Sequence, residues 1–329
     1  MALAFPLPII LLLFLSIPLS ESRLSLDYYK KSCPGFDDII RDVVSSKQST
    51  TPTTAAATLR VFFHDCMVEG CDASVLVASN SFNLAERDAD LNKNLPGDAF
   101  DVVMKAKLAL EVKCPKIVSC ADILAQVTRD LVIMVGGPFY DVRLGRKDGL
   151  ISKAANVPGN LPTTNMTMDQ MIQFFKMKGF EVKEMVALMG GHTIGFSHCK
   201  EFAARLYHYS KTTPTDPGLN PKFAEALKKF CSNYTKDPTM SAFNDVLSPG
   251  KFDNMYYQNL PRGLGLLRSD HILNQDSRTR PFVEQYAANQ KLFYDDFSHA
   301  MEKLSVRQIK TGKKGEVRSR CDQFNSIKV

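Results

Sequence analysis

The chain has 329 residues, of which 44% are hydrophobic, and 41 Lys and Arg against 35 Asp and Glu give a formal net charge of +6. This length can bury the core of one large or two medium domains. The basic residues form no face interleaved with aromatic residues, which argues against nucleic-acid binding. The most basic region, 303–320, is either a solvated surface or a contact for acidic polysaccharide of the extracellular matrix.

The chain begins with the apolar run "MALAFPLPIILLLFLSIPLS". Prolines interrupt this run, and the small residues Ser20 and Ser22 suit a cleavage site, so we predict a secretory signal peptide over 1–22, although a basic n-region is missing. A membrane anchor is the alternative, but a span needs roughly 20 apolar residues. No later segment is long and apolar enough to cross a membrane, so the predicted mature chain, 23–329, is not a membrane protein.

Helical periodicity dominates the rest of the chain, and alternating strand-like segments are nearly absent, so a mainly α fold is predicted. Apolar residues recur at helical spacing in 37–48, 51–65, 99–114, 119–137, 167–179, 183–195 and 221–231. Loops rich in proline and glycine cover 136–165 and 210–221, and the first separates two helical halves. A cofactor pocket is expected between such halves.

One short stretch, "LRVFFHDCMVEGCDAS", combines two kinds of chemistry. If 54–65 is helical, Arg60, Phe63 and His64 share one face. The arginine disfavours the imidazolium, so the histidine stays a neutral proton acceptor, while the guanidinium stabilises developing negative charge. The pair therefore suits heterolysis of a polar bond. The alternative is a histidine that merely packs in the core.

The second kind of chemistry is a cluster of oxygen ligands. Asp65 closes the predicted helix, where a carboxylate is electrostatically unfavourable, so a positive charge should offset it. Asp72 and Ser74 add oxygen ligands, and Gly70 permits a turn that exposes carbonyls. Hard oxygen ligands suit calcium. The alternative is an ordinary polar turn.

Eight cysteines behind a signal peptide predict four disulfides, although their spacing leaves the pairing open. A zinc site is the alternative, because His64, Cys66 and Cys71 are close in sequence, but no C-x-x-C pair occurs. The sequons at Asn165 and Asn233 predict exposed, N-glycosylated loops.

Five stretches together resemble the secretory plant haem peroxidases of class III: "LRVFFHDCMVEGCDAS", "CPKIVSCADILA", "GGPFYDVRLGRKDG", "ALMGGHTIGFSHC" and "FDNMYYQNL". The resemblance extends from about Leu24 to Cys321, with the motifs in the family's order. It implies the haem-peroxidase fold, in which two helical halves sandwich a haem and four disulfides staple the chain. The halves would be about 23–165 with the C-terminal segment, and about 166–300.

The resemblance assigns roles that the residues alone left open. His192 would be the axial ligand of one b-type haem, with Asp270 as the carboxylate that orients it. His64 would be the distal base and Arg60 the stabiliser of the charge that develops as peroxide is cleaved. Three further residues would complete this site: Asn92, which holds His64 as a neutral acceptor, Phe63, which walls off the distal side, and Pro162, which lines the donor channel.

The resemblance also implies two calcium ions and a disulfide pairing. The first ion would bind Asp65, Val68, Gly70, Asp72 and Ser74, and the second Thr193, Asp245, Ser248 and Asp253. The disulfides would be Cys33–Cys114, Cys66–Cys71, Cys120–Cys321 and Cys199–Cys231. Asp122 and Arg146 match a buried ion pair of the family. Departures from the common pattern, none in the catalytic set, are Met67, Glu69, Tyr140, Thr164, Met189 and Ser248.

The implied activity is that of a donor:hydrogen-peroxide oxidoreductase. Hydrogen peroxide becomes water while phenolic donors lose one electron each, in cell-wall and lignin oxidation, peroxide removal or the stress response. The protein would be a secreted, extracellular monomer of the cell wall, apoplast or vacuole. Two rivals are a non-catalytic matrix-binding protein that keeps the fold and a secreted zinc-dependent hydrolase that uses His64. The physiological donor is not encoded in any recognisable motif.

Overall fold

The computed structural model describes residues 24–326, so the predicted signal peptide lies outside the described residues. Within that range the chain is mainly helical, as predicted, and has one short ribbon of two strands, β1 (Phe196–His198) and β2 (Ser241–Phe243). The α-helices are α1 (Phe36–Thr50), α2 (Thr54–Val68), α3 (Gly97–Lys113), α4 (Cys120–Met134), α5 (Met168–Met177), α6 (Val182–Met189), α7 (Ala203–Tyr207), α8 (Pro221–Phe230), α9 (Met255–Asn259), α10 (Arg268–Leu273), α11 (Arg280–Ala288) and α12 (Gln290–Ser305).

Local sequence explains where several helices begin. The Ser119 side chain accepts a hydrogen bond from the backbone of Asp122 and so caps α4. Thr167 and Gln170 form a reciprocal capping box at the start of α5. α8 starts at Pro221, whose missing N–H costs nothing at the first helical position.

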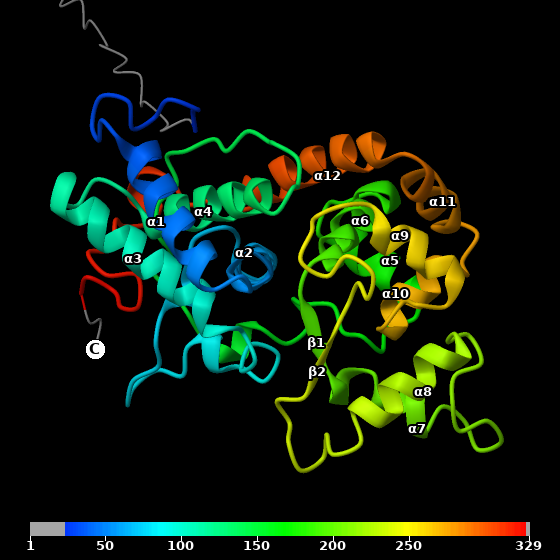
Figure 1. The fold of residues 1–329 in the computed structure, drawn as a ribbon. Coiled ribbons are helices and arrows are strands. Elements are labelled where there is room, and N and C mark those ends of the chain that lie inside the picture. Colours follow the sequence, from blue (N-terminus) through cyan, green and yellow to red (C-terminus); the bar gives the residue numbers. More distant parts are fainter. Residues whose placement is uncertain (1–23, 327–329) are drawn as a thin grey trace, which may run out of the picture.

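The helices form two groups (Figure 1). α1 to α4 lie together on one side, and α5, α6, α9, α10 and α11 lie on the other. α12 runs across the top from the second group toward the first, and it packs mainly against α6 and also against α2. α7, α8 and the ribbon lie below the second group. α12 therefore ties the two groups of helices together.

Two hydrophobic clusters hold this arrangement. The larger one draws side chains from both groups of helices, and the smaller one lies around α7 and α8. All four predicted disulfides are present, which confirms the pairing that the resemblance implied: Cys33–Cys114, Cys66–Cys71, Cys120–Cys321 and Cys199–Cys231. Because Cys66 and Cys71 bond to each other, they are not zinc ligands. The predicted ion pair of Asp122 and Arg146 is fully buried, with 2.9 Å between Oδ1 and Nη1.

Two predicted helix ends are wrong. α2 continues to Val68, so Asp65 lies in its last turn and does not close it. The segment 183–195 is not one helix, because α6 ends at Met189 and a 3₁₀ turn, Gly190–Thr193, follows. Glycines at 190 and 191 explain the early end, since glycine lowers helix stability. Within 24–326 no helix is long and apolar enough to cross a membrane.

Candidate active site

The face of α2 that carries Arg60, Phe63 and His64 points toward the turn that follows α6. Gly191 and Gly195 lie so close to α2 that an added Cβ would come within 3.3 Å of Leu59 and 2.9 Å of Ala56. Positions 56, 60, 63 and 64 share one helical face because they are three or four residues apart. The face that the sequence spacing predicted is therefore the one that meets the segment after α6.

The hydrogen bonds of His64 fix which ring nitrogen can act as a base. Its Nδ1 lies 2.7 Å from Oδ1 of Asn92, and the Asn92 amide donates to the Glu86 carbonyl at 2.8 Å. Since the amide nitrogen is thus engaged as donor, Oδ1 is the acceptor, and His64 carries its proton on Nδ1. Nε2 keeps its lone pair and can take up a proton.

Burial and the charge of Arg60 lower the pKa of His64 to about 3, against a smaller upward effect of the Asn92 hydrogen bond. The imidazole is therefore neutral above that pH.

His192 has the same ring but a different partner. Its Nδ1 lies 2.8 Å from Oδ1 of Asp270, a buried carboxylate that also accepts a hydrogen bond of 2.9 Å from the Tyr256 hydroxyl. Burial opposes protonation of His192, but the charge and hydrogen bond of Asp270 outweigh it and raise its pKa. With Nδ1 directed at a carboxylate, Nε2 is left to bind a metal.

Arg60 connects the two histidines electrostatically, because its charge lowers the pKa of both imidazoles. The Arg60 side chain is accessible to solvent and donates to the carbonyl of Asn94 at 3.0 Å, yet burial lowers its pKa. A side chain that is accessible and still surrounded by protein lies in a recess. His64 and His192 are likewise only half-buried, which fits two imidazoles that face a shared space.

A cluster of buried carboxylates lies just beyond this helix. Asp65 accepts hydrogen bonds from the backbone N–H groups of Ala73 and Val75, at 2.9 and 3.3 Å. Asp72 and Glu86 are buried beside it. Burial and the charge of Asp72 raise the pKa of Asp65 to about 8. Burial, Asp65 and Asp72 raise that of Glu86 to about 9. These acids are therefore short of positive charge.

Ser74, also buried, lies 3.1 Å from Oε2 of Glu86, and the other oxygen of Glu86 has no hydrogen-bond partner among residues 24–326. Gly70 has a φ of +102°, and an added Cβ would come within 2.5 Å of the Gln308 carbonyl, so only glycine fits this turn. An oxygen-rich, buried and under-compensated cluster is what a hard cation would neutralise.

Three positively charged side chains lie near the end of α2. Arg307, Lys178 and Lys310 donate to the carbonyls of Cys66, Met67 and Glu69, at 2.6, 2.7 and 3.0 Å. They come from two distant parts of the chain, near 178 and 307–310, and bond to the C-terminal carbonyls of the helix, where cations are favoured. The Asp65 carboxylate itself keeps a raised pKa despite the charge of Arg318, so these three cations do not supply the charge predicted to offset it.

A second oxygen cluster follows His192. Ser248 Oγ lies 3.0 Å from Oδ2 of Asp245 and 3.1 Å from Oδ1 of Asp253, and the Asp253 amide approaches Thr193 Oγ1 at 3.5 Å. The structure thus brings together all four side chains named for the second ion. In residues 24–326 no three or more His, Cys, Asp or Glu side chains are grouped as a metal site, so hydroxyl and carbonyl oxygens would have to complete either cluster.

Sequence reasoning missed Glu86 and Tyr256, which support the two histidines. Glu86 contacts Asn92 through its backbone carbonyl, which any residue type supplies, so no sequence signal was available. Tyr256 lies in "FDNMYYQNL", and its bond to Asp270 depends on the fold. Pro162 is half-buried, and the sequon residues Asn165 and Asn233 are exposed, as predicted.

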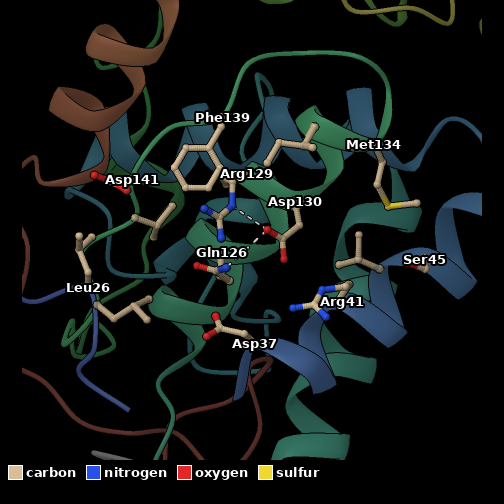
Figure 2. Close-up of a pocket in the computed structure, with 14 residues that line it drawn as sticks. Leu26, Asp37, Arg41, Ser45, Gln126, Arg129, Asp130, Met134, Phe139 and Asp141 are labelled. Carbon is tan, nitrogen blue, oxygen red and sulfur yellow. Dashed lines mark hydrogen bonds and ion pairs between the residues drawn. The ribbon is translucent and has the colours of Figure 1, made fainter. Parts of the chain in front are cut away.

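A cavity of about 590 Å³ opens elsewhere, between α1, α4 and the loop after α4 (Figure 2). Figure 2 shows Asp130 bonded to Arg129 on α4, with Asp37 and Arg41 of α1 opposite and Phe139 above. None of the predicted site residues lines it. This cavity is therefore separate from the candidate active site.

Comparison with known proteins agrees with the geometry. The model of the family described as Peroxidase matches residues 40–289. The chain is 61% identical to Peroxidase 65 of Arabidopsis thaliana over 93% of its own length and 90% of the relative's. It is 62% identical to Peroxidase 41 of the same plant, over 93% of each chain, and 47% identical to Peroxidase 55, over 96% and 94%.

The matches to Peroxidase 65 and Peroxidase 41 extend over 306 and 307 residues, 93% of this chain. The same chain combines mainly helical structure, four disulfides and two differently supported imidazoles. It therefore belongs to the peroxidase family, among the plant class III enzymes, and is an oxidoreductase with peroxidase activity.

Proposed function

We propose that this peroxidase holds one b-type haem between His192 and His64, with His192 as axial ligand and His64 as distal base. One observation carries the proposal: each imidazole has Nδ1 engaged and Nε2 free, and both respond to the charge of Arg60. Asp270 is buried, and its Oδ2 has no hydrogen-bond partner among the described residues. Such a carboxylate suits the support of a metal-ligating imidazole. The residues present therefore fit the haem that the family implies.

When bound, the haem would supply the iron that accepts the oxidising equivalents of hydrogen peroxide. The protein's own part is proton transfer and charge stabilisation. His64 Nε2 takes the proton from one peroxide oxygen and returns it to the other, so that water can leave. Arg60 stabilises the negative charge that develops as the O–O bond breaks. Asn92 holds Nδ1 protonated, which keeps Nε2 available for this transfer.

Two phenolic donors complete the cycle by losing one electron and one proton each. In sum, one hydrogen peroxide and two phenols give two waters and two phenoxyl radicals. Phe63, beside His64 on α2, would close the distal side to donors, and Pro162 would line their channel. Their half-buried positions are compatible with these roles.

We further infer two calcium ions. The first would bind Asp65, Asp72 and Ser74 with the carbonyls of Val68 and Gly70, and the second would bind Thr193, Asp245, Ser248 and Asp253. The raised pKa of Asp65 supports the first, because a cation would lower it again. The contacts of Ser248 with two carboxylates support the second. Each cluster adjoins a segment that carries one of the histidines.

The proposal extends to the biological setting. The protein would be a secreted, glycosylated monomer that acts outside the cell or in the vacuole, after loss of 1–22. Its substrates would be hydrogen peroxide and small phenolic donors, in cell-wall and lignin oxidation, peroxide removal or stress response. Acidic polysaccharide is a further candidate partner for the basic C-terminal region. The haem would lie between two halves, one of about 23–165 with the C-terminal segment and one of about 166–300.

Reconstitution with hemin tests the proposal most directly. Oxidised recombinant protein should acquire a Soret band and then oxidise guaiacol only when peroxide is present. His192→Ala should lose the band, whereas His64→Ala should keep it and lose the reaction. A wild-type protein that stays colourless, or a His192→Ala variant with an unchanged spectrum, would refute the assignment.

A further inference from the structure

The segment that follows His192 lies along the face of α2 that carries Arg60. Gly195 approaches Ala56 so closely that an added Cβ would be 2.9 Å from the alanine Cβ. Ala56 and Arg60 are four residues apart and therefore neighbours on one face. Beyond Gly195 the chain forms β1 and then a 3₁₀ turn, Cys199–Glu201. Glu201 ends this turn, six residues after the glycine that contacts α2.

Glu201 is free to contact a ligand. Its side chain is 40% exposed, and in the described part of the chain its one ion-pair contact is Lys200, 3.9 Å away, which is too far for a hydrogen bond. The charge of Glu201 reaches Arg60, where it raises the pKa that burial lowers. Arg60 is itself accessible to solvent. A molecule that enters beside Arg60 therefore meets a carboxylate as well as a guanidinium.

The charges of Arg60 and Glu201 act differently on donors that carry a carboxylate and on donors that carry an ammonium group. A cavity whose only charge is Arg60 would attract phenols that carry a carboxylate. An exposed acid next to it offsets that attraction and offers a partner for an ammonium group. The same segment exposes Phe196, which packs edge-to-face on Phe243 across the ribbon at 6.4 Å. The face of an aromatic side chain attracts both other aromatic rings and cations.

We propose that Glu201 determines donor specificity, by binding the positively charged arm of aromatic amines that also carry a phenol. The inference rests on the proposed function, because the donor must reach the site that Arg60 and His64 face. The ammonium group itself is unchanged in the reaction. Only the phenol of such a donor is oxidised: it loses one electron and one proton, as described for the phenolic donors above.

A matched pair of donors tests this. Tyramine and 3-(4-hydroxyphenyl)propionate carry the same phenol but opposite charges. For the hemin-reconstituted enzyme, the ratio of their kcat/KM values, tyramine over propionate, is measured in wild type, Glu201→Gln and Glu201→Lys. An exposed ion pair changes binding by about two- to fivefold. We expect the ratio to fall by at least about that factor in Glu201→Gln and to fall further in Glu201→Lys.

The control is Glu225→Gln, which removes the same charge from an exposed position on α8. It leaves the net charge of the whole molecule equal to that of Glu201→Gln, so an unchanged ratio in this variant assigns the effect to position 201. High salt should reduce the difference between wild type and Glu201→Gln, since exposed charges are screened. Equal ratios in wild type, Glu201→Gln and Glu201→Lys would overturn the proposal.

A binding measurement separates this inference from the proposed function. Saturation-transfer NMR without peroxide reports the Kd of tyramine for the resting protein. Weaker tyramine binding in Glu201→Gln than in Glu225→Gln supports the role of Glu201, even if no donor is oxidised. Oxidation of guaiacol together with identical tyramine affinities would instead keep the proposed function and reject the specificity role.

Discussion

The two histidines of the candidate site differ in their hydrogen-bond partners, and their pKa values shift in opposite directions. His64 bonds to a neutral amide oxygen and lies within reach of a cation, so its pKa falls to about 3. His192 bonds to a buried carboxylate, and its pKa rises. In the proposed function the first would be the distal base, because it is neutral, and the second would be the axial ligand, because a carboxylate enriches its ring. The two rings differ in the partner of Nδ1, an amide oxygen for His64 and a carboxylate for His192.

The largest expected effect comes from removing the base. His64→Ala should slow the reaction with peroxide by about 10²- to 10⁴-fold, the usual contribution of a general acid–base group. Stopped-flow mixing of the reconstituted variant with peroxide measures this rate. The Soret band should persist, because His64 is not the proposed ligand. A variant that reacts as fast as wild type would show that another group moves the proton.

Removing the charge of Arg60 should change both the rate of the reaction with peroxide and the dependence of that rate on pH. Arg60→Leu should slow peroxide cleavage by about 10²- to 10³-fold, as for other groups that stabilise developing charge. In wild type the base function is lost only as pH falls through about 3, where His64 becomes protonated. Without Arg60 the pKa of His64 rises, so the acid limb of the rate profile should move to higher pH. An acid limb that stays in place would contradict the coupling of these two residues.

Replacing Asp270, the carboxylate that bonds to His192, is expected to have the next largest effect. Asp270→Asn keeps the shape of the side chain but removes the charge that raises the pKa of His192. Haem affinity should fall by about 10- to 100-fold, the usual effect of such a supporting carboxylate. Hemin transfer to apomyoglobin measures the loss. Asp295→Asn, at an exposed position on α12, serves as the charge-matched control.

The smallest expected effect is a shift in thermal stability with pH and calcium. Asp65 and Glu86 have raised pKa values in the folded chain, about 8 and 9. Folding favours the protonated forms of both acids. Their contribution to the free energy of unfolding is therefore fully present below about pH 4, where both acids are also protonated in the unfolded chain. It is then lost as pH rises through 8 to 9.

Chelated protein should therefore show a Tm that falls between pH 5 and 9. Added calcium should restore it most at high pH, because the ion binds the ionised carboxylates. Differential scanning calorimetry at several pH values, with calcium and with EGTA, measures both trends. An equal effect of calcium at pH 5 and pH 9 would argue against these carboxylates as ligands.

Several features were predictable from the sequence. The spacing of Arg60, Phe63 and His64 identified one face of α2, because helical periodicity is a local property. Cysteine number predicted four disulfides, but their pairing came only with the family resemblance. Periodicity failed at 183–195, where α6 ends early and His192 lies in a 3₁₀ turn.

Only the tertiary structure decided what the site residues can do. Asp270 reaches His192 across 78 positions in the chain, and Arg307 reaches the end of α2 across 241. Glu86 supports Asn92 through a backbone carbonyl that no side-chain pattern reveals. Local spacing fixes which side chains share a helix face. The tautomer and pKa of each histidine depend on hydrogen bonds and burial, which exist only once distant segments have packed together.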